Sequence, residues 1–244
     1  MKLINNYKFI IIIFLIITGC KSNTEPILQN LPKPYMSLHV GDIRQYYDDP
    51  EGLYLQTKIV DTTHRVDGQK VFVFEESFFS SGVVYKGTNY YFIKNGFFLQ
   101  TELDTVTNPT INHDNPFLES KLAKILPKKG DYFMRTAGVQ DSEKVFFKIN
   151  IIDSLNTTYK TFNNVAEYQV INSSPASLRG GSYYAESYGH IGSIFISNTD
   201  TAKIFIIYSK VGNKEIGKYV TFFDKAQSAT TKYKYIPLSN LNNN

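Results

Sequence analysis

A pair of aromatic segments joined by Asn95-Gly96 is the feature that most constrains how this 244-residue chain folds. Residues 90–94 precede the Asn-Gly pair and residues 97–100 follow it, and both segments are rich in Tyr and Phe. Asn-Gly fits the two positive-φ positions of a type I′ turn, whose twist matches that of two antiparallel strands. The sequence therefore predicts a β-hairpin over residues 90–100.

Other aromatic and β-branched segments, separated by turn residues, predict that this hairpin belongs to a larger sheet. The chain contains 18 Tyr, 18 Phe and no Trp, a composition that favours strands over helices. Asp67-Gly68 and Gly212-Asn213 are typical of turns between strands. Further strands are expected at residues 53–59, 71–74, 145–152, 165–171, 183–186, 193–197, 203–208 and 215–223.

One short helix is predicted, at residues 117–125. Asn115 can cap its start, Pro116 suits the first helical position, and Pro127 ends it. The apolar residues spaced as one helical face are Leu118, Leu122 and Ile125.

The expected fold class is mainly β, with antiparallel sheets that form a sandwich or barrel-like domain over residues 35–237. One short helix covers little of a sheet, whereas a closed barrel or a sandwich buries aromatic residues with strands alone. We expect the chain's own side chains to fill the interior, as they do in most small barrels. The alternative is a half-open sheet whose apolar cavity holds a ligand. Residues 238–244 are expected to form a disordered tail.

Short matches about 90 residues apart raise the alternative of two repeated halves, residues 35–116 and 117–237. Such matches also arise by chance in a biased composition, so a single unrepeated domain stays open. The matching pairs are Gly41-Asp42 with Gly130-Asp131, Lys58-Ile59 with Lys148-Ile149, Tyr90-Tyr91 with Tyr183-Tyr184, and Gly96 with Gly189.

The first 20 residues have the marks of a secretory signal: Lys2 and Lys8, an apolar run at residues 9–17, and small residues before a cleavage point. Ile17-Thr18-Gly19-Cys20 resembles the bacterial lipobox, which implies removal of residues 1–19 and acylation of Cys20. The alternative, a transmembrane helix, needs about 20 apolar residues. Residues 20–34, rich in Pro and polar side chains, are expected to form a flexible tether.

The lipobox implies a protein that is exported and lipid-anchored to the bacterial envelope. Lys21 rather than Asp follows Cys20, which favours the outer membrane by analogy with retention rules. Cys20 is the only Cys, so the body has no disulfide and depends on its core. Removal of residues 1–19 takes away Lys2 and Lys8 and leaves 24 Lys and Arg residues and 22 Asp and Glu residues. This nearly neutral net charge gives no basis for binding nucleic acid.

Three short motifs carry a further resemblance: Gly41-Asp42 near the domain start, Phe-Asn-Asn-Val at residues 162–165, and Tyr183-Tyr184 leading to Gly-x-x-Gly at residues 189–192. With these motifs the chain resembles a loose group of bacterial lipoproteins of unknown activity. The resemblance implies an exported, β-rich domain and no particular reaction.

Catalytic and metal-binding motifs are missing from the sequence. The four histidines, His39, His64, His113 and His190, form no pair at metal-ligand spacing. The acidic segment at residues 48–52 matches no calcium loop and is typical of a solvated turn. We therefore predict no catalytic residue, no metal site and no cofactor, and we expect the protein not to be an enzyme.

Five tyrosines are the remaining candidates for a ligand-binding surface. Adjacent residues on a strand face opposite ways, so one tyrosine of each pair should be buried. One interpretation is sheet packing with hydroxyls at the rim; the other is an aromatic surface that faces a ligand. The candidates are Tyr90, Tyr91, Tyr183, Tyr184 and Tyr188.

Three functions follow as hypotheses. The leading one is a membrane-anchored envelope lipoprotein with a non-enzymatic structural or binding role, whose partners are the membrane, through the lipid on Cys20, and another envelope protein. The second is a carrier of an apolar ligand or lipid in a β-sheet cavity. The third is a cell-surface hydrolase, which the missing motifs disfavour.

Overall fold

The computed structural model describes residues 32–49, 52–80, 82–104, 119–137, 143–174, 179–196, 201–225 and 228–230. Lys33–Asn244 forms a unit with its own core, and every buried apolar residue that the structure describes lies within it. Within the described ranges, no helix is long and apolar enough to cross a membrane.

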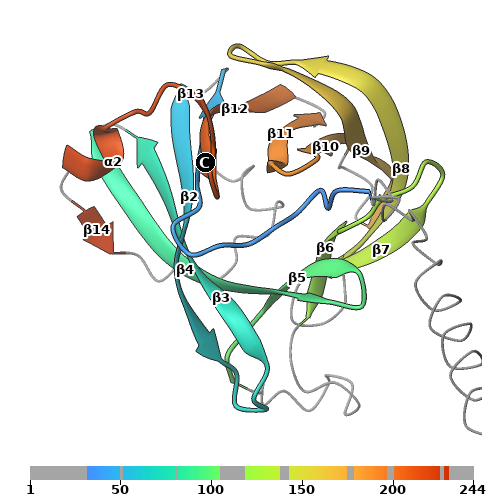
Figure 1. Cartoon of the computed structure of the whole chain (residues 1–244), viewed down its shortest axis with the longest axis horizontal. Helices are drawn as coiled ribbons and strands as arrows, with labels where there is room; N and C mark the ends of the chain where they lie inside the picture. Colours follow the sequence, from blue (N-terminus) through green and yellow to red (C-terminus); the bar gives the residue numbers. More distant parts are fainter. Residues whose placement is uncertain are drawn as a thin grey trace, which may run out of the picture. The chain divides into compact units, whose positions relative to one another are not determined.

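Twelve antiparallel strands of the described residues form one continuous sheet, built from two consecutive meanders (Figure 1). The first meander comprises β1 (Ile43–Asp48), β2 (Leu53–His64), β3 (Lys70–Ser80), β4 (Val83–Lys94), β5 (Phe97–Thr101) and β6 (Ser120–Lys124). The second comprises β7 (Tyr132–Ala137), β8 (Glu143–Asn156), β9 (Thr161–Ser174), β10 (Arg179–Ala185), β11 (Gly189–Ile196) and β12 (Thr201–Val211).

The two meanders join along β1 and β12, which pair from Ile43↔Lys210 to Asp48↔Ile204. The strand order therefore starts at β6 and finishes at β7. The sheet curves until these two strands lie side by side, so it forms a nearly closed, barrel-shaped sheet (Figure 1). The expected fold class is confirmed, and of the two architectures the barrel-like one is found.

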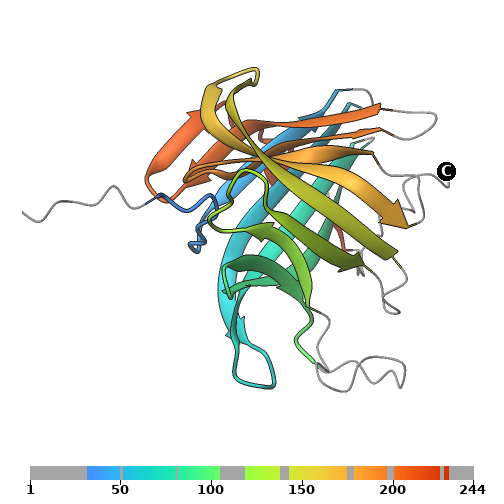
Figure 2. The same cartoon turned by 90° about the vertical axis from the view of Figure 1, so that its right-hand side faces the viewer.

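The chain enters at one end of the barrel through residues 33–40, which we call the plug segment. Because successive strands alternate in direction, the turns that follow β4, β6, β8, β10 and β12 lie at this same end, which we call the plug end. The turn after β2 lies elsewhere, since its Val66 N–H donates to the carbonyl of Leu103, beyond β5, and its Arg65 pairs with Glu119, before β6. Figure 2 shows the plug segment, in blue, on the left, with the tip of the β8–β9 hairpin above it and that of the β2–β3 hairpin at the bottom.

Three short elements follow the second meander. β13 (Lys214–Gly217) pairs with β12, α2 (Phe222–Lys225) is a single helical turn, and β14 (Ser228–Thr230) runs parallel to β4. Phe222 packs against Tyr54 and Phe79, with ring centroids 5.2 and 4.9 Å away. The strand predicted at residues 215–223 thus ends at Gly217, whose φ of +80° interrupts the extended backbone.

The hairpin at residues 90–100 is confirmed. β4 and β5 pair up to Lys94↔Phe97, and the two turn residues between them, Asn95 and Gly96, have φ values of 52° and 75°. Asp67-Gly68 and Gly212-Asn213 also lie in turns between paired strands.

The helix predicted at residues 117–125 is wrong. Residues 120–124 form β6, which pairs with β5 from Phe97↔Lys124 to Gln100↔Ser120; residues 117 and 118 lie outside the described part. Ala123 is fully buried and its neighbours are not. A short apolar segment fits a helix or a strand equally well by its periodicity, and here pairing with β5 decides the outcome.

The positions matched in the sequence repeat are equivalent in the structure. The Gly41 N–H donates to the Ile59 carbonyl at 2.8 Å, and the Ile59 N–H donates back to the Asp42 carbonyl at 2.9 Å. Gly130, Asp131 and Ile149 make the same two bonds, each at 2.8 Å. Each aspartate also accepts a bond from the N–H of the residue three before it, His39 or Lys128. We call this set of bonds around Gly-Asp the Gly-Asp step.

The two meanders are therefore equivalent strand for strand, β1 to β7 through β6 to β12. Because β6 completes the first meander, that meander runs past residue 116, the limit predicted from the sequence, to Lys124. The predicted domain limits at residues 19, 116 and 237, and the tail at residues 238–244, fall outside the described residues.

We predict that Asp42→Ala lowers the free energy of unfolding by roughly 2–4 kcal/mol. The Asp42 carboxylate is buried and accepts bonds from the N–H groups of His39 and Gly212, and removing it leaves these donors without partners. Chemical denaturation measures the change. Asp153→Ala, at an exposed position of β8, is the control and should change stability by less than about 0.5 kcal/mol.

Candidate functional site

The interior of the barrel is packed with aromatic and aliphatic side chains from both meanders. Phe74 lies 4.5 Å from Tyr91 between ring centroids, and Phe133 stacks on Phe147 at 5.1 Å. The buried residues of this cluster are Ile59, Phe74, Tyr91, Phe98, Ala123, Phe133, Val145, Phe147, Ile149, Ala166, Tyr168 and Tyr184. Two hollows of the described residues, at the plug end, are lined by side chains that for the most part lie outside this cluster.

The plug segment closes this interior at the end where the chain enters. Tyr35, Met36 and Leu38 are buried in the same cluster as the strand side chains. The Tyr35 N–H donates to the Ile125 carbonyl at 2.9 Å, and its hydroxyl donates to the Asn164 carbonyl at 2.6 Å. The segment is therefore bonded to both meanders.

We call the line where the two terminal strands, β6 and β7, lie side by side the seam. Side-chain contacts, instead of a ladder of backbone hydrogen bonds, hold these two strands together. The Tyr168 hydroxyl accepts from the Lys124 N–H at 3.1 Å and donates to the Lys124 carbonyl at 2.9 Å. The Lys124 ammonium lies 3.0 Å from the Asp131 carboxylate, and the ring of Phe97 meets that of Phe133 at 5.8 Å. These contacts satisfy an exposed strand edge that would otherwise pair with another chain.

A carboxylate lies on the inner face of β3. Glu76 accepts bonds from the Tyr91 hydroxyl at 2.5 Å and the Asn89 amide at 2.7 Å. Burial raises the pKa of Glu76 and outweighs these two bonds, which act to lower it. Burial first, and the Glu76 charge second, raise the pKa of Tyr91.

Arg44 is the second charged group of the interior. Its side chain is almost wholly buried; Nε donates to the Tyr188 carbonyl at 2.8 Å, and Nη2 has no partner among the described residues. Burial, followed by the Arg44 charge, lowers the pKa of His190 to about 4. His190 is therefore neutral at physiological pH and its Nε2 bonds to the Ser193 hydroxyl at 2.8 Å.

The five tyrosines selected from the sequence do not share one surface. Tyr91 and Tyr184 are buried in the interior, and burial raises the pKa of Tyr184 to about 12. Tyr90 and Tyr183, their strand neighbours, lie on the opposite face and are partly buried. Tyr188 lies in the turn after β10, where Lys160 donates to its hydroxyl at 2.7 Å. A ligand-binding role for these residues stays a prediction.

Sequence reasoning missed Glu76, Arg44 and Tyr168. A signal existed for Glu76, because it continues the alternation of apolar residues at Phe72, Phe74 and Phe78 on one side of β3. No comparable local pattern marks Arg44 or Tyr168, since their partners lie far away in the sequence.

Groups for catalysis or metal binding are sparse in the described part of the chain. It holds no set of three or more His, Cys, Asp or Glu side chains that could bind a metal ion. His39 Nδ1 lies 3.5 Å from the Asp42 carboxylate, in a hollow of about 480 Å³ that Ser37 and Ser187 also line. Asp131, the equivalent residue of the second meander, accepts the same bond from the Lys128 N–H. This structural bond accounts for the presence of Asp42, so no catalytic pairing with His39 is needed to account for it.

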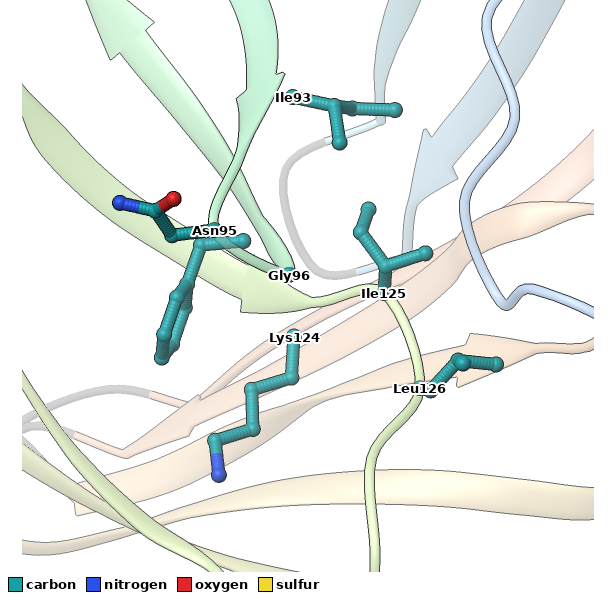
Figure 3. Close-up of a pocket in the computed structure, with 7 residues that line it drawn as sticks. Ile93, Asn95, Gly96, Lys124, Ile125 and Leu126 are labelled. Atoms are coloured by element: carbon teal, nitrogen blue, oxygen red, sulfur yellow. The ribbon is translucent and has the colours of Figure 1, made fainter.

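A second hollow, of about 330 Å³, lies at the plug end beside the seam (Figure 3). It is formed by the β4–β5 turn and the segment that follows β6. Its lining is mostly apolar, with one ammonium group from Lys124. The lining residues are Ile93, Asn95, Gly96, Phe97, Lys124, Ile125 and Leu126.

Comparison with known proteins gives two solved structures. One, from Bacteroides fragilis, is a protein inferred to be exported, with a YmcC-like fold; it has 14% identity and a TM-score of 0.43. The other, from Parabacteroides distasonis, is inferred to be a lipoprotein; it has 12% identity and a TM-score of 0.37. Each covers 73% of this chain, and the match includes 99% of the other chain.

No protein-family model matches the chain, and no curated protein matches it.

We predict that Tyr168→Phe lowers the free energy of unfolding by about 1–2 kcal/mol, because the N–H and the carbonyl of Lys124 both lose their partner at the seam. Equilibrium denaturation measures the loss. Tyr159→Phe, at an exposed turn position, is the matched control. Equal effects of the two substitutions would contradict a sealing role for the Tyr168 hydroxyl.

A second prediction concerns pH. Because burial raises the pKa of Glu76, the folded state holds the Glu76 proton more tightly than the unfolded state. The wild-type stability relative to Glu76→Gln should therefore fall as pH rises from the unfolded-state value, about 4.3, through the raised folded-state value. Denaturation curves across this range test the slope. Glu75→Gln, one residue away on the opposite face of β3, should show no such trend.

Proposed function

We propose that the chain is an envelope lipoprotein, acylated at Cys20, whose barrel-shaped body has a binding or structural role and is not an enzyme. The observation that carries the proposal is that the chain's own residues fill the barrel. Aromatic residues of both meanders pack its interior, and Tyr35, Met36 and Leu38 close one end.

The sequence supports the anchor. Ile17-Thr18-Gly19-Cys20 has the lipobox pattern and follows a basic start and a short apolar run. The plug segment begins 13 residues after Cys20, so the body follows the anchor after a short connection. By analogy with retention rules, Lys21 favours the outer membrane.

The packed interior disfavours a carrier of apolar ligands. Such carriers enclose their ligand in a concave, mostly apolar cavity. Here the two described hollows are open and lie at the surface of the plug end, outside the packed cluster. A hydrolase is disfavoured because the Asp42 carboxylate already accepts bonds from the N–H groups of His39 and Gly212, as Asp131 does from that of Lys128 in the second meander.

We predict that the wild-type precursor takes up an alkyne analogue of palmitate in bacterial cells and that Cys20→Ala does not. The same substitution should leave the precursor uncleaved, because Cys20 is the only Cys and the expected acylation site. In-gel detection of the label and the shift in mass measure both effects. Ser22→Ala is the control, and absence of label from the wild type would overturn the proposed anchor.

The filled interior predicts that the unacylated body, residues 21–244, carries no bound lipid after purification. Organic extraction followed by mass spectrometry measures this directly, and a fluorescent fatty acid tests uptake. Stoichiometric lipid in the extract, or saturable uptake of the fatty acid, would instead establish the carrier.

A further inference from the structure

We propose that the plug end is a membrane-binding surface that rests on the anionic phospholipid headgroups of the bilayer holding the Cys20 lipid. The inference rests on the proposed acylation for the identity of that bilayer, but the surface itself is argued from the body alone. Three observations meet at this end: the place where the chain enters, the charge of the turns and their exposed apolar residues.

The chain enters the body at the plug end (Figure 2). The 12 residues between Cys20 and the plug segment can span at most about 40 Å, even when fully extended. The strands alone are nearly this long: the 14 residues of β8 extend over about 45 Å. The tether therefore keeps the plug end within about 40 Å of the acyl anchor.

The turns of the plug end carry a surplus of lysines. The acidic side chains in the same segments are largely engaged: Asp42 with backbone N–H groups and Asp131 with Lys124 at 3.0 Å. Glu186, partly buried, is the remaining acid of these turns. The exposed lysines are Lys33, Lys128, Lys129 and Lys214, together with Lys94, which pairs with Glu119 at 3.5 Å.

Exposed apolar side chains lie among these lysines, on separate connections at the same end. Leu126 follows β6 beside the apolar hollow of Figure 3, and Tyr159 is in the turn after β8. Val40 ends the plug segment. These three residues are 48, 49 and 56% exposed, in that order.

Lysines that surround exposed apolar residues are complementary to a membrane surface, which has a layer of charged headgroups above the acyl chains. Ammonium groups are attracted to headgroup phosphates, while the apolar and aromatic residues enter the boundary below. A protein partner would need a continuous surface, whereas these apolar residues stand on separate turns that a fluid bilayer can reach independently. The ammonium of Lys124 is paired with Asp131, so at the hollow the apolar side chains of Ile93, Ile125 and Leu126 would meet an acyl chain.

Vesicle binding by the unacylated body tests the proposal separately from acylation. The body, residues 21–244, contains the whole described core, and it should sediment with vesicles that contain phosphatidylglycerol but not with pure phosphatidylcholine vesicles. Lys128→Glu with Lys129→Glu should weaken binding by about tenfold or more, since each lysine near an anionic surface contributes roughly a fivefold gain. Added salt should weaken the binding of the unsubstituted body as well.

The matched control reverses the same number of charges at the opposite end, where Arg179 begins β10 and Lys203 lies near the start of β12. Arg179→Glu with Lys203→Glu should leave binding within about twofold, because these residues point away from the surface. Equal loss in both double variants, or equal sedimentation with both vesicle types, would overturn the proposal.

The body has no Cys after residue 20, so an environment-sensitive fluorophore can be attached at a single introduced site. At Leu126→Cys its emission should shift to the blue with anionic vesicles, and a lipid-borne quencher should reduce it. At Ile196→Cys, which is 42% exposed at the opposite end, neither change is expected. A blue shift at position 196 and none at position 126 would contradict the proposed orientation.

Discussion

Closure of the sheet is the constraint on which the rest of this structure depends. Twelve strands in one path have two terminal edges, and the aromatic interior stays dry only if these edges meet. On one side the meanders join through the backbone ladder of β1 and β12. On the other, the Tyr168 hydroxyl bonds both backbone groups of Lys124, and the plug segment adds the bond from Tyr35 to Ile125. Side chains and the plug segment thus close the edge between β6 and β7, where the described residues form no ladder of backbone hydrogen bonds.

Equivalent positions of the two meanders carry different side chains, and these differences give the meanders different contacts. Phe74 opposes Ile59 in the first meander, and Tyr168 opposes Ile149 at the equivalent position in the second. The two aromatic residues have nearly the same shape, but only Tyr168 carries the hydroxyl that reaches β6. The Gly-Asp step is kept in both meanders because its bonds hold each first strand against the second, and Gly41 and Gly130 have the positive φ that it requires.

The parts of the fold that depend on neighbouring residues could be predicted from the sequence. The Asn95-Gly96 hairpin, most strands and the equivalent Gly-Asp steps follow from turn chemistry and alternation. β6 could not be predicted, because five residues with a buried Ala123 become a strand only through pairing with β5. Arg44 and Tyr168 have partners 144 and 44 residues away, and no short window of sequence contains such a relation. Glu76 could have been found, since it occupies an inward-facing position in the alternation of Phe72, Phe74 and Phe78 on β3.

Hydrogen–deuterium exchange of the body, residues 21–244, tests the closed barrel most directly. β6 is a short strand that pairs with β5 on one side only, so in an open sheet its edge amides would exchange with solvent rapidly. If the seam is sealed, the amide of Lys124 should be protected to a degree similar to amides in the ladder of β1 and β12. An amide at Lys124 that exchanges as fast as those of exposed turns, while β1 stays protected, would contradict this account.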